Sequence, residues 1–193
     1  MNCSDCGREI VSGESYTIID GKPKHTKGSF PDADPLSLIA EKHGTDKGPS
    51  THGYTALYHT LFGAKREKVE KVLEIGIFKG NSLKMWSDYF PNARVVGVDI
   101  NPECAKLDFS AFPRVQVIIG DAGQPRTIRE VDVALGRDVD LIVDDGSHLG
   151  PDIMAAFDAY FFMLRTMGVY VIEDVNLRRS ASAMWICWKT EMA

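Results

Sequence analysis

Acidic side chains stand directly after several short apolar runs of this 193-residue sequence. Each run is rich in β-branched residues and has the length of a buried strand. In a parallel sheet the carboxyl ends of the strands meet at one edge, which is where open α/β sheets bind ligands. The pattern therefore predicts an acidic ligand site at one sheet edge, built from Asp99, Asp121, Asp144, Asp145, Glu173 and Asp174.

Three of these carboxylates and a nearby histidine suggest metal-assisted proton transfer. Asp145, Glu173 and Asp174 offer hard oxygen ligands from two runs, which suits Mg²⁺ with some waters retained. His148 follows Asp145 by three residues and can act as a general base on a hydroxyl whose pKa the metal lowers. We expect His148 and Asp145 to be catalytic. The alternative is structural: Asp145 binds amides of its own turn, and Asp174 caps the next segment.

Residues 69–86 predict a buried strand, a glycine loop and a helix, the opening unit of a nucleotide-binding sheet. Gly76 and Gly80 mark the loop, and Asn81 or Ser82 should cap the helix. Glycine lets the backbone approach a ligand closely, and a helix N-terminus offers unpaired N–H groups. The spacing E-x-G-x-x-x-G differs from the G-x-G-x-x-G of dinucleotide sites, which weighs against a dehydrogenase.

The carboxylate of Glu74 beside this loop indicates the kind of ligand. It repels phosphate but suits a cationic, hydroxyl-bearing ligand such as S-adenosylmethionine. Asp99 ends the next strand about 25 positions later, where α/β nucleotide sites hold ribose hydroxyls. Asp144 and Asp145 are neighbours and should point to opposite faces, one toward the cofactor and one toward a substrate. The predicted cofactor contacts are Glu74, Gly76, Gly80, Ser82, Asp99 and Asp144.

Five predicted strands alternate with helices through most of the chain. This order predicts an α/β protein with a doubly wound, mostly parallel sheet covered on both faces. The strands are expected at 69–77, 94–100, 115–121, 139–144 and 168–175. The helices are expected at 36–43, at 55–62, after the cap at Asn81 or Ser82, after 101–102, at 126–135 and at 152–165.

Composition narrows the class of protein. A net charge of −5 argues against a nucleic-acid binder, and the most apolar region, 153–172, is interrupted by charges and glycine. The first nine residues are polar and lack the apolar core of a secretion signal. We therefore expect a cytoplasmic protein that does not bind membranes, with its four cysteines reduced.

Residues 1–30 differ from the rest and form a predicted cysteine-knuckle extension. Cys3 and Cys6 have C-x-x-C spacing, a hairpin is expected around an Asp-Gly turn, and His25 follows it. Structural zinc is almost always four-coordinate, and Gly28 stands where a fourth ligand is expected. The alternatives are a zinc site at Cys3, Cys6 and His25 completed from elsewhere, or a degenerate knuckle. A turn-rich linker then opens the main domain, 31–193.

Five stretches of the main domain resemble the class I S-adenosylmethionine-dependent methyltransferases. Within that class the sequence is similar to the mycinamicin-type macrolide sugar O-methyltransferases and the related cephalosporin-hydroxylase-like proteins. Glu-x-Gly alone is common to many methyltransferases, whereas Asp-Asp-Gly-Ser-His together with Glu-Asp is far more specific. The stretches are 43–48, 73–83, 97–100, 144–148 and 172–174, within 36–175.

The resemblance implies a Mg²⁺-dependent O-methyltransferase that acts on a hydroxyl of a small molecule such as a sugar. Related enzymes form oligomers, so a homo-oligomer is expected. It implies that Glu74, Gly76 and Asp99 hold the cofactor with Asp121 near its adenine, that Asp145, Glu173 and Asp174 bind Mg²⁺, and that His148 is the base.

The C-terminal part departs from that family. Its sheets normally have seven strands and close with an antiparallel hairpin, whereas 176–193 offers one further strand or helix. We expect the last strands to be shortened or missing, which leaves an apolar edge at Trp185 and Trp188 that favours association. The alternative function is a non-catalytic cofactor-binding module that recruits a partner through its termini. His148 and the three predicted metal ligands favour the enzyme.

Overall fold

The computed structural model describes residues 16–19, 22–25, 34–176 and 182–190. The chain divides into two compact units, Met1–Leu61 and Phe62–Ala193. The predicted division at residue 30 is a different one and stays a prediction. Cys3 and Cys6 of the proposed knuckle lie outside the described residues. His25 belongs to a described strand, and zinc binding by Cys3, Cys6 and His25 stays a prediction.

The first unit contains a hairpin and a pair of helices. Strands β1 (Tyr16–Ile19) and β2 (Lys22–His25) pair antiparallel, as the sequence predicts. Helix α1 (Pro35–His43) begins after Asp34, whose carboxylate accepts a hydrogen bond from the Ser37 backbone N–H at 2.9 Å. It ends at Gly44 in a left-handed conformation, and helix α2 (Thr55–Phe62) follows a polar loop.

The second unit is an α/β sheet domain. The strands of its sheet are β3 (Lys71–Ile75), β4 (Arg94–Asp99), β5 (Val115–Ile119), β6 (Val139–Asp144), β7 (Leu164–Asn176) and β8 (Ser182–Trp188). Its α-helices are α3 (Asn81–Tyr89), α4 (Pro125–Leu135) and α5 (Gly150–Tyr160). Short 3₁₀ turns lie at Gly63–Lys68, Pro102–Lys106 and Phe161–Met163.

The sheet order is β5-β4-β3-β6-β7-β8. The first five strands are parallel, and β8 returns antiparallel beside β7. This is the Rossmann-like, doubly wound arrangement that the sequence predicts, and β8 is its one additional C-terminal strand. Because β3 is central, its carboxyl end lies between those of β4 and β6.

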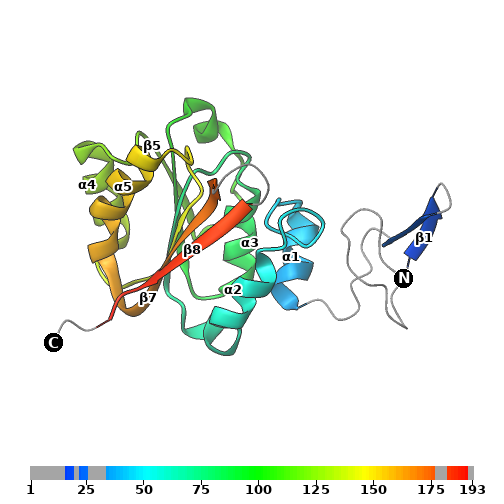
Figure 1. The fold of residues 1–193 in the computed structure, drawn as a ribbon. Coiled ribbons are helices and arrows are strands. Elements are labelled where there is room, and N and C mark those ends of the chain that lie inside the picture. Colours follow the sequence, from blue (N-terminus) through cyan, green and yellow to red (C-terminus); the bar gives the residue numbers. More distant parts are fainter. Residues whose placement is uncertain (1–15, 20–21, 26–33, 177–181, 191–193) are drawn as a thin grey trace. The chain divides into compact units, whose positions relative to one another are not determined.

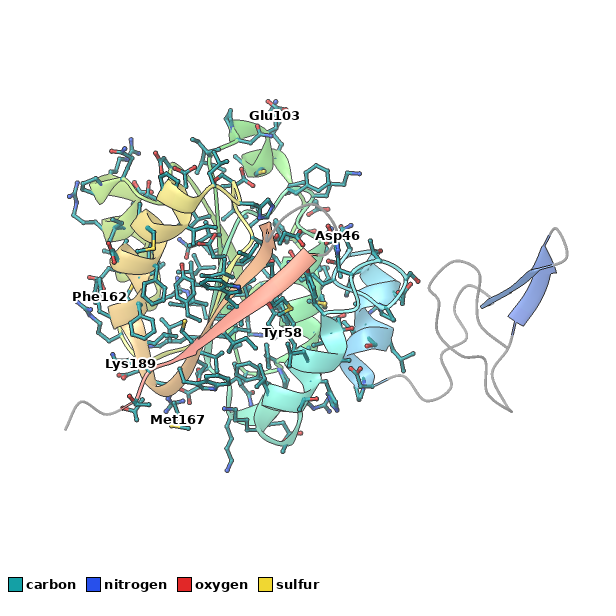
Figure 2. All side chains as sticks on the ribbon, viewed as in Figure 1. Asp46, Tyr58, Glu103, Phe162, Met167 and Lys189 are labelled. Atoms are coloured by element: carbon teal, nitrogen blue, oxygen red, sulfur yellow. The ribbon has the colours of Figure 1, made fainter. Side chains whose placement is uncertain are left out.

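Helices cover both faces of this sheet (Figure 1). Buried residues of α4 and α5 form one core with strand residues such as Leu73, Val96 and Ile142. Helix α3 covers the other face, where Leu83 packs so close to β4 that Gly97 has no room for a side chain. Side chains fill the space between the layers (Figure 2). Among the described residues, no helix is both long enough and apolar enough to cross a bilayer.

Three local predictions were wrong. The residue that caps α3 is Gly80 in a left-handed conformation, so Asn81 and Ser82 are already helical. The segment after Pro102 is a 3₁₀ turn and not an α-helix. The helix predicted at 152–165 ends at Tyr160, and strand β7 begins at Leu164. Arg165, predicted to be helical, lies in this strand, and its guanidinium donates to the carboxylate of Asp140 on β6 at 2.7 Å.

Candidate active site

The loop after β3 needs its glycines for backbone reasons. Gly76 has φ +83° and Gly80 has φ +72°, conformations that residues with side chains rarely adopt. A side chain at Gly80 would meet the ring of Phe109 at 2.5 Å, and one at Gly76 would overlap the backbone of Asp145. Contacts within the protein therefore already require glycine at both positions, whether or not a ligand binds.

Asp99 at the end of β4 holds this loop. Its Oδ2 accepts hydrogen bonds from the backbone N–H groups of Ile77 at 2.9 Å and Phe78 at 3.1 Å, and its Oδ1 accepts one from Asn101 at 2.8 Å. Partial burial raises the pKa of Asp99, but these N–H donors outweigh that effect and hold the pKa below its ordinary value. An ionised carboxylate has about four acceptor positions, and these N–H groups occupy three of them, which leaves one position for a ribose hydroxyl.

Glu74 is fully buried on β3. Its Oε2 accepts a hydrogen bond from the indole Nε1–H of Trp86 on α3 at 3.2 Å. Trp86 is not among the site residues that the sequence predicts. A buried tryptophan normally finds an acceptor for its N–H, and that rule could have pointed to this pair.

The remaining predicted cofactor residues lie in different settings. Ser82 is buried in the first turn of α3. Asp121 follows β5 and is exposed, and its Oδ1 accepts from the Gly123 backbone N–H at 2.9 Å. Its location at the end of β5 is the one predicted, and its place near an adenine stays a prediction.

Asp144 and Asp145 diverge, as their positions predict. Asp144 is buried and accepts a hydrogen bond on Oδ2 from the Tyr170 hydroxyl at 3.3 Å. Burial is the main cause that raises the pKa of Asp144 to about 6, and the Gly146 N–H and the Tyr170 hydroxyl oppose it. Burial also raises the pKa of Tyr170, and the nearby Asp144 adds to that shift. Tyr170 is not among the site residues that the sequence predicts.

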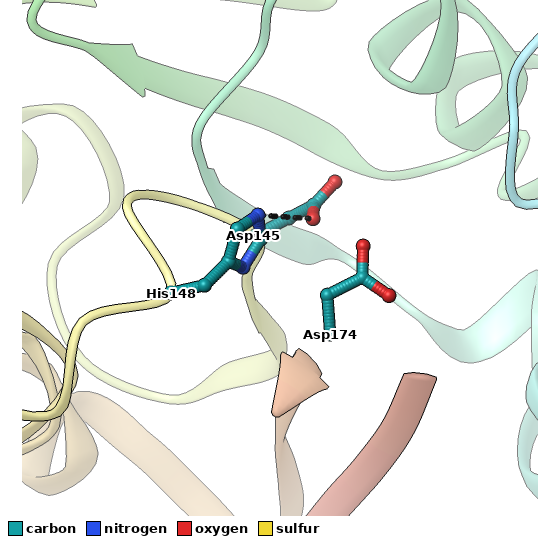
Figure 3. Close-up of side chains that lie close together, drawn as sticks. All are labelled: Asp145, His148 and Asp174. Carbon is teal, nitrogen blue, oxygen red and sulfur yellow. Dashed lines mark ion pairs between the residues drawn. The ribbon is translucent and has the colours of Figure 1, made fainter. Parts of the chain in front are cut away.

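Asp145, His148 and Asp174 come together at the carboxyl ends of β6 and β7 (Figure 3). One potential ligand atom from each lies within 4.8 Å of the others, and His148 Nε2 is 4.0 Å from Asp145 Oδ1. All three are partly exposed, and both His148 (φ +58°) and Asp174 (φ +52°) have left-handed backbones. Among the described residues, these three are the His, Cys, Asp or Glu side chains whose spacing could hold a metal ion.

Glu173 is not part of that group. Glu173 is 1% exposed, whereas its neighbour Asp174 contributes a carboxylate to the group. The pairing of β7 with β8 shifts register between Ile172 and Val175, an irregularity of the kind that redirects side chains beside active sites. The role of Glu173 as a metal ligand stays a prediction.

The donor set fits a divalent metal. Two carboxylates with room for waters suit Mg²⁺, with His148 left free as a base. An imidazole as the third ligand would instead suit a softer metal. The Asp99 carboxylate, the glycine loop and this cluster all lie at one end of a doubly wound sheet, which is the arrangement that the sequence predicts for a methyltransferase-type site.

Comparison with known proteins agrees with this class. Residues 57–180 match the FtsJ-like methyltransferase family, and the chain belongs to that family. It is 35% identical over 148 residues to the 8-demethyl-8-alpha-L-rhamnosyl tetracenomycin-C 2'-O-methyltransferase of Streptomyces olivaceus, covering 73% of this chain and 38% of the relative. It is 31% identical over 147 residues to the mycinamicin VI 2''-O-methyltransferase of Micromonospora griseorubida, covering 72% and 36%.

A solved structure with similar coverage is the MycE methyltransferase of the mycinamycin pathway in complex with Mg and SAH. It has a TM-score of 0.63 and 31% identity, over 73% of this chain and 39% of that one. The caffeoyl-CoA O-methyltransferase-like structure from Staphylococcus aureus (TM-score 0.55, 18% identity, 76% of this chain and 69% of that one) shares the fold. The chain thus spans less than two fifths of the length of the sugar O-methyltransferases it matches.

Proposed function

We propose that this chain is a Mg²⁺-dependent methyltransferase that transfers the methyl group of S-adenosylmethionine to a hydroxyl of a small molecule, and specifically to a hydroxyl of a deoxysugar. The observation that carries the proposal is the convergence of Asp145, His148 and Asp174 at the sheet edge. The sugar assignment comes from O-methyltransferase relatives whose names specify substrates with rhamnosyl and olivosyl groups.

Each residue has a role in this proposal. S-adenosylmethionine supplies the methyl group, and Mg²⁺ would bind Asp145 and Asp174 and make an acceptor hydroxyl more acidic. His148 takes the proton of that hydroxyl on its imidazole. Asp99 accepts from a ribose hydroxyl and holds the loop of Ile77 and Phe78 beside it.

Two further properties belong to the proposal. We propose a homo-oligomer that associates through the outer edge of β8, where Trp185 is 51% exposed and Trp188 is 47% exposed. We also place the protein in the cytoplasm, which agrees with free thiols at Cys104 and Cys187.

The first test is a thermal melt of the full chain with S-adenosylhomocysteine, in the presence of Mg²⁺ or EDTA. Ligand at about a hundred times its dissociation constant should stabilise the fold by roughly 2.7 kcal/mol, or about 5–10 °C. Transfer of labelled methyl from S-adenosylmethionine to rhamnosides, with and without EDTA, then tests the acceptor class.

The outcomes separate the two candidate functions. A melting shift with EDTA-sensitive transfer supports the enzyme. A melting shift without transfer to any sugar hydroxyl favours a cofactor-binding module. A folded chain whose melting temperature S-adenosylhomocysteine leaves unchanged contradicts both.

A further inference from the structure

The turn that carries Asp145 packs directly on the backbone of Gly76. A Cβ atom built on Gly76 would overlap the carbonyl oxygen of Asp145 and would lie 2.6 Å from its carbonyl carbon and 2.9 Å from Gly146 Cα. All three are backbone atoms, so no rotation of a side chain would relieve the overlap. The absence of a side chain at Gly76 is what lets the turn after β6 sit against the loop after β3.

Hydrogen bonds fix both sides of this contact. The Asp145 backbone N–H donates to the Ile75 carbonyl at 2.8 Å, and the Gly76 N–H donates to the Val98 carbonyl at 2.8 Å. Gly76 therefore cannot retreat without losing its bond to β4, and Asp145 cannot move without losing its bond to β3. The start of the Asp145–His148 segment is held in register with the central strand.

A second anchor lies on the other side of the segment. The Tyr170 hydroxyl on β7 donates to Asp144 Oδ2 at 3.3 Å, and Asp144 Oδ1 accepts from the Gly146 backbone N–H at 3.4 Å. Tyr170 is fully buried, and its ring packs edge-on against Phe157 of α5 at 5.1 Å between centroids. Its position is therefore determined by the core and not by the ligand site.

We propose that Gly76 and Tyr170 are positioning residues that fix the segment Asp145–His148, and with it the distance from Asp145 and His148 to Asp174. The inference rests on the proposed function for the role of that segment. It adds that Gly76 of the cofactor loop also sets the geometry of the metal-binding group, through a contact between two backbones. Residues that orient metal ligands typically contribute 10–100-fold to metal affinity, roughly.

The primary test is Gly76→Ala in the full chain, read by hydrogen exchange of the apo protein. The Asp145 amide should exchange at least about tenfold faster, while core amides of β3 and β4 stay within about threefold of wild type. Gly53→Ala is the matched control, because Gly53 has φ +72° but open space where its Cβ would lie. An unchanged exchange rate for Asp145 in a folded Gly76→Ala protein overturns the proposal.

The functional readout is binding of Mn²⁺, measured by electron paramagnetic resonance and by displacement with Mg²⁺. Gly76→Ala should weaken Mn²⁺ binding by about tenfold or more, whereas Gly53→Ala should leave it unchanged. Gly80→Ala separates metal from cofactor effects, because its Cβ meets the side chains of Phe109 and Leu107. It should weaken S-adenosylhomocysteine more than Mn²⁺. Equal Mn²⁺ affinity for wild type and Gly76→Ala counts against the positioning role.

Tyr170→Phe provides a variant that retains core volume, for use if Gly76→Ala does not fold. It should weaken Mn²⁺ binding about three- to tenfold. The matched control is Tyr160→Phe, because Tyr160 is equally buried but donates to the Ala122 carbonyl at 2.8 Å. Equal Mn²⁺ affinity in the two variants overturns the role of Tyr170. A wild-type chain that binds no Mn²⁺ contradicts the proposed function instead, and the Asp145 exchange rate then still decides the positioning of the segment.

Discussion

Three carboxylates of the candidate site are each held by a group from another element. Asp99 accepts from the loop after β3, Glu74 from the indole of Trp86, and Asp144 from the hydroxyl of Tyr170. Charged acceptors form the stronger hydrogen bonds, so these contacts fix side chains and backbone at once. Substitutions of these acids should therefore change both the stability of the fold and the affinity for a ligand.

Asp99→Asn tests this double role. Replacing the charged acceptor should lower the free energy of unfolding by about 1–2 kcal/mol at pH 7 and should weaken S-adenosylhomocysteine. Because the native pKa of Asp99 is below its ordinary value of 3.8, its stabilising contribution is fully present above pH 3.8 and is lost as the pH falls through the lower native pKa. The melting temperatures of wild type and variant should therefore converge in acid.

The control for that experiment is Asp108→Asn. Asp108 is exposed and accepts from the Ser110 backbone N–H at 2.9 Å, so it resembles Asp99 in local chemistry but lies outside the site. Its variant should bind S-adenosylhomocysteine as wild type does. Unchanged affinity in Asp99→Asn would argue against a ribose contact.

His148→Gln separates the base from the metal site. If His148 takes the proton, turnover should fall about 10²–10⁴-fold, while S-adenosylhomocysteine and Mn²⁺ bind within about twofold of wild type. Steady-state rates and Mn²⁺ titration of one preparation check this. A large loss of Mn²⁺ affinity would show that His148 is a metal ligand, in agreement with its place in the cluster but against its role as a free base.

Much of this residue-level site could be predicted from the sequence. Asp145 and His148 are three residues apart in one turn, and parallel strands bring Asp174 to the same edge, so topology alone predicts their proximity. The contacts of Asp99 could not be predicted, because they depend on the path of the loop backbone through Ile77 and Phe78. Tyr170 was missed because its hydroxyl matters only through a contact between two strands.

At the scale of elements, β7 shows why the sequence alone does not separate the roles of Glu173 and Asp174. Consecutive residues of a regular strand point to opposite faces, so joint ligation by both requires an irregular strand. The register shift between Ile172 and Val175 supplies one, yet Glu173 remains buried while Asp174 faces the cluster. The sequence predicts the strand but not the irregularity, because no glycine or proline marks it.

The opposite end of the sheet is held by Asp140 at the start of β6. Its Oδ2 accepts from the backbone N–H groups of Glu70 at 2.8 Å and Lys71 at 3.0 Å, and its Oδ1 accepts from the Arg165 guanidinium at 2.7 Å. This contact raises the pKa of Arg165. One buried carboxylate thus joins β3, β6 and β7 at the ends of these strands that lie away from the candidate site.

Asp140→Ala should therefore destabilise the fold without changing ligand affinity. The loss should be about 2–4 kcal/mol, because two backbone N–H groups and a guanidinium lose their acceptor. Urea denaturation measures it, and Asp132→Ala is the control because Asp132 is half-exposed and 3.9 Å from Arg137. A loss below about 0.5 kcal/mol, the range of ordinary surface substitutions, would contradict the role of Asp140.

At the scale of the whole molecule, strand β8 forms one lateral edge of the sheet. In the described part of the chain β8 pairs with β7 alone, and its sequence Ser-Ala-Met-Trp-Ile-Cys-Trp contains neither charge nor proline. Soluble proteins usually protect such an edge with charges, proline or a covering element. Exposed Met167 and Phe162 lie near the end of this strand at Lys189 (Figure 2), whose amine donates to the carbonyls of Phe162 and Leu164.

Trp185→Lys tests the proposed association through this edge. A charge at the centre of β8, whose outer edge pairs with no strand in the described part of the chain, should oppose pairing with a second copy. The variant should therefore sediment as a smaller species than wild type at equal concentration. The control is Val133→Lys, because Val133 is 88% exposed on α4, on a helix that contributes nothing to β8. Sedimentation velocity over a range of concentrations measures all three proteins. A wild-type chain that sediments as a monomer throughout would contradict the homo-oligomer, and an equal decrease in both variants would place the interface elsewhere.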